Sequence, residues 1–101
     1  NLVRTVKPVG FDIEHWPEPP PIFDLVRTLG GIAEEEMYRT FNMGIGFALV
    51  VAPTGADAVR ERLEQAGLMV HVLGRAFEDA ERTIRMRPKG LLGRRGRFAA
   101  A

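Results

Sequence analysis

The sequence contains no cysteine and only two histidines, His15 and His71. Without cysteine, the chain can form no disulfide, no thiolate metal site and no cysteine nucleophile. The two histidines lie far apart in the sequence and show no zinc-binding spacing. His71 follows apolar residues that favour a strand, so we interpret it as a sheet residue. We therefore predict no metal site in this chain.

Long apolar runs and an excess of charge of one sign are also missing. Crossing a bilayer takes about 18 apolar residues in succession, and no stretch reaches that length, so no membrane partner is predicted. The 14 basic and 13 acidic residues leave a net charge of +1, too little to attract nucleic acid through a general field. The basic cluster at 94–97 is interpreted as a solvated surface. The lack of cysteine is consistent with a cytoplasmic protein.

A chain of 101 residues forms at most one domain. It begins with Asn1 and not with methionine, so we expect a fragment of a longer protein. Three stretches favour helices, at about 20–30, 33–41 and 57–66. Apolar residues expected to face a core from the first two helices are Ile22, Leu25, Val26, Leu29, Met37 and Phe41.

Four stretches favour strands. Residues 10–16 alternate in polarity, and 47–52 are apolar throughout, which predicts a strand buried on both faces. Residues 69–77 favour a strand in which Gly74 marks a bulge or a close approach of two backbones, and 82–86 favour its hairpin partner. The sequence thus predicts an α+β fold with helices layered on a mixed or mostly antiparallel sheet. The stretch 89–101, basic and rich in glycine, is expected to be a mobile tail.

The candidate binding site is the short loop between the second helix and the predicted strand at 47–52. Gly44 and Gly46 allow a ligand to approach the main chain, successive backbone amides can form an anion-binding concavity, and Asn42 can both donate and accept hydrogen bonds. The alternative is an ordinary turn in which Asn42 caps the helix. The residues alone favour the ordinary turn and leave substrate binding by Asn42, Gly44 and Gly46 open.

Other polar residues favour structural roles. The side chains of Glu34, Glu35 and Glu36 point about 100° apart around a helix, so they cannot converge on one ion and are interpreted as a solvated face. Arg39 and Arg75 lie near the predicted loop and strand, where either could meet a phosphate, but an ion pair with a glutamate is the simpler role. No acid or base is evident, so the catalytic residues remain unassigned.

Two sequence segments resemble a known family. Residues 30–37 (GGIAEEEM) and 39–46 (RTFNMGIG), with flanking matches at 20–23 and 72–74, are similar to the carboxy-terminal domain of aminoimidazole ribonucleotide synthetases, also called phosphoribosylformylglycinamidine cyclo-ligases. The resemblance implies a cytoplasmic, homodimeric enzyme of purine biosynthesis. That enzyme uses ATP and Mg²⁺ to close the imidazole ring of formylglycinamidine ribonucleotide. It also implies that an amino-terminal domain, absent here, binds most of the nucleotide, and that Asn42, Gly44 and Gly46 line the substrate cleft.

On this resemblance, residues 1–88 form part of the carboxy-terminal domain, 89–101 form the tail, and the fragment alone is inactive. Two alternatives stay open. Sister ATP-using enzymes share the fold: formylglycinamidine ribonucleotide synthetase, selenophosphate synthetase, thiamine-monophosphate kinase and a hydrogenase-maturation factor. The chain could also be a stand-alone α+β binding module. Against a stand-alone module, we expect a part-domain to leave apolar side chains such as Leu29 uncovered.

Overall fold

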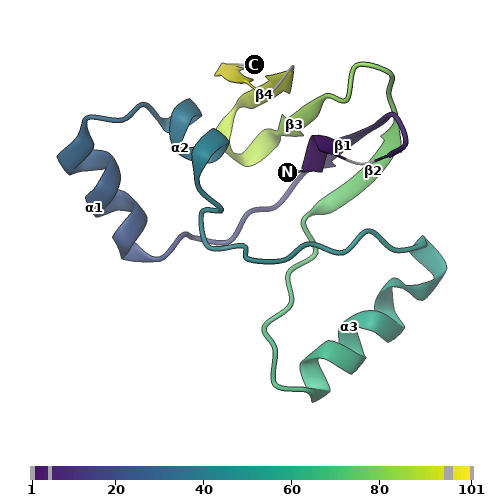
Figure 1. The fold of residues 1–101 in the computed structure, drawn as a ribbon. Coiled ribbons are helices and arrows are strands. Elements are labelled where there is room, and N and C mark those ends of the chain that lie inside the picture. Colours follow the sequence, from purple (N-terminus) through teal and green to yellow (C-terminus); the bar gives the residue numbers. More distant parts are fainter. Residues whose placement is uncertain (1, 5, 95–96, 101) are drawn as a thin grey trace.

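A mixed five-stranded sheet organises the described part of the chain (Figure 1). The structure is a computed structural model that describes residues 2–4, 6–94 and 97–100. The strands are β1 (Val9–Ile13), β2 (Gly74–Glu78), β3 (Ile84–Met86), β4 (Leu91–Arg94) and β5 (Arg97–Ala100), in the order β2-β1-β3-β4-β5. Strand β1 pairs antiparallel with β2 and parallel with β3, and the remaining pairs are antiparallel.

Helices differ in how closely they approach this sheet. They are α1 (Pro21–Gly30), α2 (Glu34–Thr40) and α3 (Ala56–Gln65), with short 3₁₀ turns η1 (Leu2–Arg4), η2 (Pro53–Gly55) and η3 (Arg87–Lys89). Helix α2 packs against β5, whereas α1 lies to one side and α3 lies well away from the sheet (Figure 1). None of the helices in the described ranges combines the length and apolar composition needed to cross a bilayer.

The core lies between α2 and the sheet. Met37 on α2 is completely buried. The partly buried side chains of Trp16, Phe23 and Phe98 pack against the edge of the core. The buried apolar side chains are Phe11, Ile13, Met37, Tyr38, Met43, Ile84, Met86 and Leu91. Neither α1 nor α3 contributes a buried residue. The α+β class and the mixed sheet agree with the prediction, but only one of the three described α-helices covers the sheet closely.

The predicted strand at 47–52 is absent from the structure. These residues run as an extended segment from the loop toward α3 and pair with no strand (Figure 1). Phe47 is 83% exposed, and Leu49, Val50 and Val51 are also exposed. An apolar run becomes a buried strand only where a neighbouring strand satisfies its backbone groups and other layers cover both faces. The described residues supply neither to this segment.

The predicted hairpin of 69–77 with 82–86 is also wrong, because β1 lies between β2 and β3. The Asp79 backbone amide donates to the Pro8 carbonyl oxygen (3.0 Å), which wraps the turn after β2 around the start of β1. Strand β2 begins only at Gly74, where an added Cβ would collide with the Asp12 carbonyl oxygen. The close approach predicted at Gly74 is therefore confirmed.

Where the structure describes it, the segment expected to be a mobile tail contributes two strands instead; its residues 95, 96 and 101 lie outside the described residues. Leu91 in β4 is buried, and Phe98 in β5 packs against the edge of the core. The glycines and arginines of this segment led to the prediction of a tail. The strands that contain Leu91, Leu92 and Phe98 nevertheless pair along the open edge of the sheet.

Candidate functional site

Helix α2 holds the candidate loop in place through its buried face. Met37 and Tyr38 anchor the helix in the core. The helix ends at Thr40, and the backbone amide of Phe41 donates to the Met37 carbonyl oxygen at 2.9 Å. Phe41 also forms an edge-to-face contact with Phe23 on α1, with ring centres 6.3 Å apart. The loop therefore starts from a fixed point on the core.

The loop itself is a tight turn that Asn42 organises. The side-chain oxygen of Asn42 accepts a hydrogen bond from the Gly44 backbone amide (2.9 Å). The backbone carbonyl oxygen of Asn42 accepts one from the Ile45 backbone amide (3.1 Å). The two central residues have positive φ angles, 50° at Met43 and 96° at Gly44. Positive φ at both central positions is the pattern of a type I′ turn. Asn42 therefore stabilises the turn, and Phe41, not Asn42, occupies the cap position of α2.

Met43 carries the unusual backbone of this turn. A non-glycine residue in the left-handed region costs on the order of 1–3 kcal/mol and persists only where its surroundings hold it. Here the Met43 side chain is buried at 6% exposure. Its carbonyl oxygen accepts a hydrogen bond from the Trp16 indole N–H at 3.4 Å, and the Trp16 ring packs edge-on against Tyr38. Burial of the Met43 side chain and the hydrogen bond from Trp16 thus hold the strained turn in place.

The fold requires only one of the two glycines in the loop. At Gly44 an added Cβ would lie 2.8 Å from Cδ of Pro20, and its φ also disfavours a side chain, so the fold itself requires glycine. At Gly46 an added Cβ would meet nothing within 4 Å, and φ lies outside the left-handed region. Nothing in the described fold requires glycine at Gly46, and the position is open to the approach of an outside group.

The predicted concavity of free backbone amides is only partly available. The amides of Gly44 and Ile45 are already bonded to Asn42 within the turn. The side-chain amide nitrogen of Asn42 and the open side of Gly46 are therefore the groups that the described loop offers to a ligand. The structure brings all three predicted residues into one turn, and their role in binding substrate remains a prediction.

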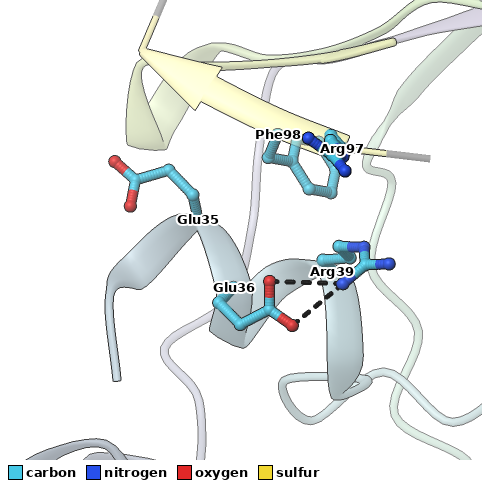
Figure 2. A pocket seen from close by; sticks show the side chains of 5 residues that line it. All are labelled: Glu35, Glu36, Arg39, Arg97 and Phe98. Carbon is cyan, nitrogen blue, oxygen red and sulfur yellow. Dashed lines mark hydrogen bonds and ion pairs between the residues drawn. The ribbon is translucent and has the colours of Figure 1, made fainter. Parts of the chain in front are cut away.

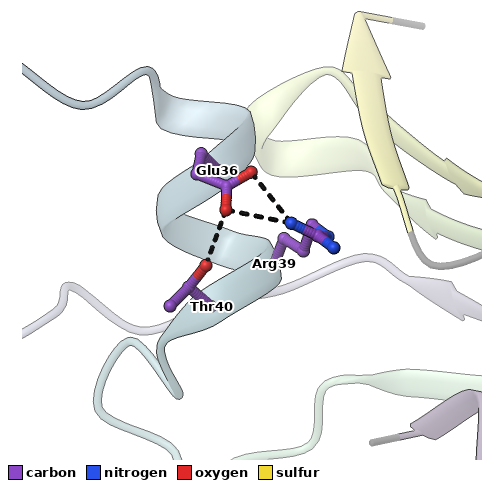
Figure 3. Close-up of polar contacts among 3 residues, drawn as sticks. All are labelled: Glu36, Arg39 and Thr40. Carbon is purple, nitrogen blue, oxygen red and sulfur yellow. Dashed lines mark hydrogen bonds and ion pairs between the residues drawn. The ribbon is translucent and has the colours of Figure 1, made fainter.

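Charged residues on α2 pair with one another beside the loop. The Arg39 guanidinium donates to both carboxylate oxygens of Glu36 (3.1 and 3.4 Å), and the Thr40 hydroxyl donates to the same carboxylate at 2.9 Å (Figure 3). The simpler role predicted for Arg39, an ion pair with a glutamate, is confirmed. Arg75 lies in β2 opposite Asp12 of β1.

A cleft of about 310 Å³ lies beside the contact of α2 with β5 (Figure 2). Glu35, Glu36, Arg39, Arg97 and Phe98 line it. Sequence reasoning missed Arg97 and Phe98 here because it placed them in a tail; the only available signal was an apolar phenylalanine beside a basic cluster. The cleft carries charges of both signs and gives no preference for one kind of ligand.

Tyr38, on the buried side of α2, lies beside Lys89. Burial raises the pKa of the Tyr38 hydroxyl, and the nearby Lys89 ammonium, 5.9 Å from the ring centre, opposes the shift.

Among the described residues, no group of three or more His, Cys, Asp or Glu side chains could hold a metal ion. Glu34, Glu35 and Glu36 therefore do not converge on a common centre.

Comparisons with known proteins point to one family. The sequence profile described as AIR synthase related protein, C-terminal domain, matches residues 4–87. A phosphoribosylformylglycinamidine cyclo-ligase from Methanococcus vannielii is 41% identical over 81 residues, which are 80% of this chain and 23% of that protein. The protein of the same name from Methanocaldococcus jannaschii is 39% identical over 81 residues, with the same two shares. Another from a Thermoanaerobacter species is 48% identical over 59 residues, 58% of this chain and 18% of that protein.

The chain thus spans less than a quarter of the length of the cyclo-ligases that it matches. No solved structure matches it. The family match includes β1, α1, α2, the loop and β3, and it ends before β4 and β5. The candidate loop therefore lies inside the matched region, while two wall residues of the cleft, Arg97 and Phe98, lie outside it.

Proposed function

The chain belongs to the AIR synthase related family, whose C-terminal domain it matches over residues 4–87, and we propose that it is the carboxy-terminal part of a phosphoribosylformylglycinamidine cyclo-ligase. The complete enzyme activates the formyl oxygen of formylglycinamidine ribonucleotide by phosphoryl transfer from ATP. An internal nitrogen then attacks the activated carbon, the imidazole ring closes, and aminoimidazole ribonucleotide, ADP and phosphate are released. The cyclo-ligase names of the matched relatives support this reaction over those of sister enzymes.

Within that enzyme, the loop from Asn42 to Gly46 lines the side of the cleft that receives substrate. The observation that carries this assignment is the contrast between the two glycines. Gly44 is explained by the turn, whereas Gly46 faces open space with an unstrained backbone. The hydrogen bond from Trp16 to Met43 holds the turn in place. The Asn42 side-chain amide would then already be ordered before a ligand binds. Binding would cost less conformational entropy as a result, which favours affinity.

The nucleotide and its Mg²⁺ do not fit the described residues as a binding site. No cluster of three or more carboxylate or histidine side chains is present there to hold a metal, and the Gly44 and Ile45 amides are already bonded. We assign ATP and Mg²⁺ to the remainder of the parent protein. Homodimer formation and a cytoplasmic location belong to the same proposal. The domain boundary predicted near residue 88 does not, because β4 and β5 extend the same sheet and Leu91 lies in its core.

Exposed apolar side chains support a part-domain over a stand-alone module. One set lies on α1, where Ile22, Leu25 and Leu29 are exposed. A second set lies on the extended segments on either side of α3: Phe47, Leu49, Val50, Val51, Leu68, Met69 and Val72. Large exposed apolar surfaces usually meet other protein, and these side chains provide the material for such surfaces. In the parent, the remaining chain would cover them, and 47–52 would gain the strand neighbours that it lacks here.

The test is ATP-dependent conversion of formylglycinamidine ribonucleotide by the full-length parent. We expect turnover by the wild type, and a loss of about tenfold in kcat/KM for Asn42→Ala, which is the size of one lost hydrogen bond. Gly46→Ala should raise KM because its methyl group enters the cleft. Gly55→Ala is the matched control, since its added Cβ also meets nothing within 4 Å but lies at the start of α3; its kinetics should match the wild type.

Two results would overturn parts of this proposal. A folded parent that binds ATP but does not form aminoimidazole ribonucleotide would move the assignment to a sister enzyme. An active parent in which Asn42→Ala and Gly46→Ala behave like Gly55→Ala would remove the loop from the substrate site and leave the cyclo-ligase assignment standing.

A further inference from the structure

The two histidines, 56 positions apart in the sequence, meet in the fold. His15 follows β1, and His71 precedes β2. Their ring centres are 6.0 Å apart, with the ring planes tilted by 41°. Two backbone hydrogen bonds hold the segments together: the Leu73 carbonyl oxygen accepts from the amides of Glu14 (2.7 Å) and His15 (3.0 Å). The backbone segments that carry the two rings are therefore held side by side.

This separation suits one ion shared by two imidazoles. Zinc binds an imidazole nitrogen at about 2.0–2.1 Å, which places the ion about 3 Å from the ring centre. Two rings that share an ion at a tetrahedral or wider angle then have centres about 5–6 Å apart. His15 is exposed and His71 is half-buried, so rotation of the His15 ring can turn a nitrogen toward the shared position without moving the backbone.

We propose that His15 and His71 form a binding site for a divalent transition-metal ion such as Zn²⁺, Ni²⁺ or Cu²⁺. Imidazole nitrogen suits these ions, whereas Mg²⁺ and Ca²⁺ prefer oxygen ligands. The described residues offer no group of three or more ligating side chains, so water completes the coordination. The site binds a hydrated ion reversibly and is separate from the Mg²⁺ that accompanies ATP. The contact of His15 with His71, which carries this proposal, is independent of the proposed function.

A bound ion would link the segment that supports the candidate loop with the approach to β2. The residue after His15 is Trp16, whose indole N–H donates to the Met43 carbonyl oxygen of the strained turn. The segment after His71 leads into β2 at Gly74. An ion held by both histidines therefore crosslinks the approach to α1 with the approach to β2 and restricts the position of Trp16.

The experiment is a calorimetric titration of the chelator-treated full-length parent with Cu²⁺, which binds such ligands most tightly in the divalent series. We compare the wild type with His15→Gln, His71→Gln and the double variant. Each single variant should bind at least about tenfold more weakly, which corresponds to about 1.4 kcal/mol. The double variant should bind no more weakly than the weaker single variant, because either loss already destroys the shared site.

Electron paramagnetic resonance of the Cu²⁺ complex gives a second readout, with coupling to two imidazole nitrogens expected in the wild type and to fewer in each variant. Glu18→Gln, an exposed acidic residue near His15, is the control and should bind like the wild type. Near-ultraviolet circular dichroism confirms that the variants fold. Wild-type affinity in either single variant, or loss of binding in only one of them, would overturn the shared site.

Discussion

Arg87 holds the carboxylate of Asp12 with two parallel hydrogen bonds, Nε to Oδ1 at 2.8 Å and Nη2 to Oδ2 at 2.9 Å. Asp12 lies in β1, an interior strand of the sheet, and is only 5% exposed. Arg87 follows β3 directly and keeps about half of its side chain in solvent. The pair therefore ties β1 to the end of the strand that runs parallel to it, and it satisfies a carboxylate that burial would otherwise destabilise.

This pair predicts a defined dependence of stability on acid. The hydrogen bonds from Arg87 hold the pKa of Asp12 below its ordinary value. A carboxylate with a lowered folded-state pKa stabilises the fold above its unfolded pKa, about 3.9, and the contribution is lost as pH falls through the folded value. Asp12→Asn in the parent should therefore lower the unfolding temperature by a constant amount above about pH 5, and the difference from wild type should shrink as the pH falls below that value.

The control for this prediction is Asp24→Asn. Asp24 is 85% exposed in its side chain and lies 3.7 Å from Arg27, and an exposed pair of this kind contributes little. Its unfolding temperature should follow the wild type at every pH. An Asp12→Asn difference that stays constant down to pH 2 would show that the pair does not act through the charge of Asp12.

The two loop glycines should differ in stability as clearly as in function. Gly44→Ala places a methyl group against Pro20 and forces alanine into a positive φ, so we expect a loss of roughly 1–3 kcal/mol in the free energy of unfolding. Gly46→Ala meets no neighbour and reduces the freedom of the unfolded chain, so stability should stay the same or rise by up to about 1 kcal/mol. Denaturant unfolding of the parent measures both; equal losses would contradict the described turn.

A third prediction separates the core of this segment from the face that the parent covers. Met37 is fully buried, and Met37→Ala should cost about 2–5 kcal/mol. Leu29 is 79% exposed here, and substitution of an exposed residue usually changes stability by less than about 0.5 kcal/mol. If the remaining chain covers α1 as we propose, Leu29→Ala in the parent should cost about 2 kcal/mol or more.

Denaturant unfolding of the full-length parent again provides the measurement, with Met37→Ala showing that the method resolves a core substitution. A change within about 0.5 kcal/mol for Leu29→Ala, beside a large change for Met37→Ala, would mean that α1 stays open to solvent in the parent. That result would remove the exposed α1 face as support for a part-domain and would leave the family assignment untouched.

Local signals in the sequence predicted the helices well, since proline at the start, glycine at the end and apolar spacing all act within a few residues. They also placed Asn42, Gly44 and Gly46 in one loop and identified the family. They did not reveal that Asn42 uses its side-chain oxygen within the turn, or that Gly44 is required by Pro20, because both facts depend on backbone angles and on packing against a distant segment.

By itself the sequence determined the helix positions to within one residue at each end, the α+β class and the family, because each rests on residue patterns that are complete within a short stretch. Only the tertiary structure decided which strands pair, where β1 inserts between β2 and β3, and which apolar residues are buried. It alone brought Asp12 to Arg87 and His15 to His71. Pairing and burial depend on what another part of the chain offers in space, and a run such as 47–52 remains exposed where no neighbour is supplied.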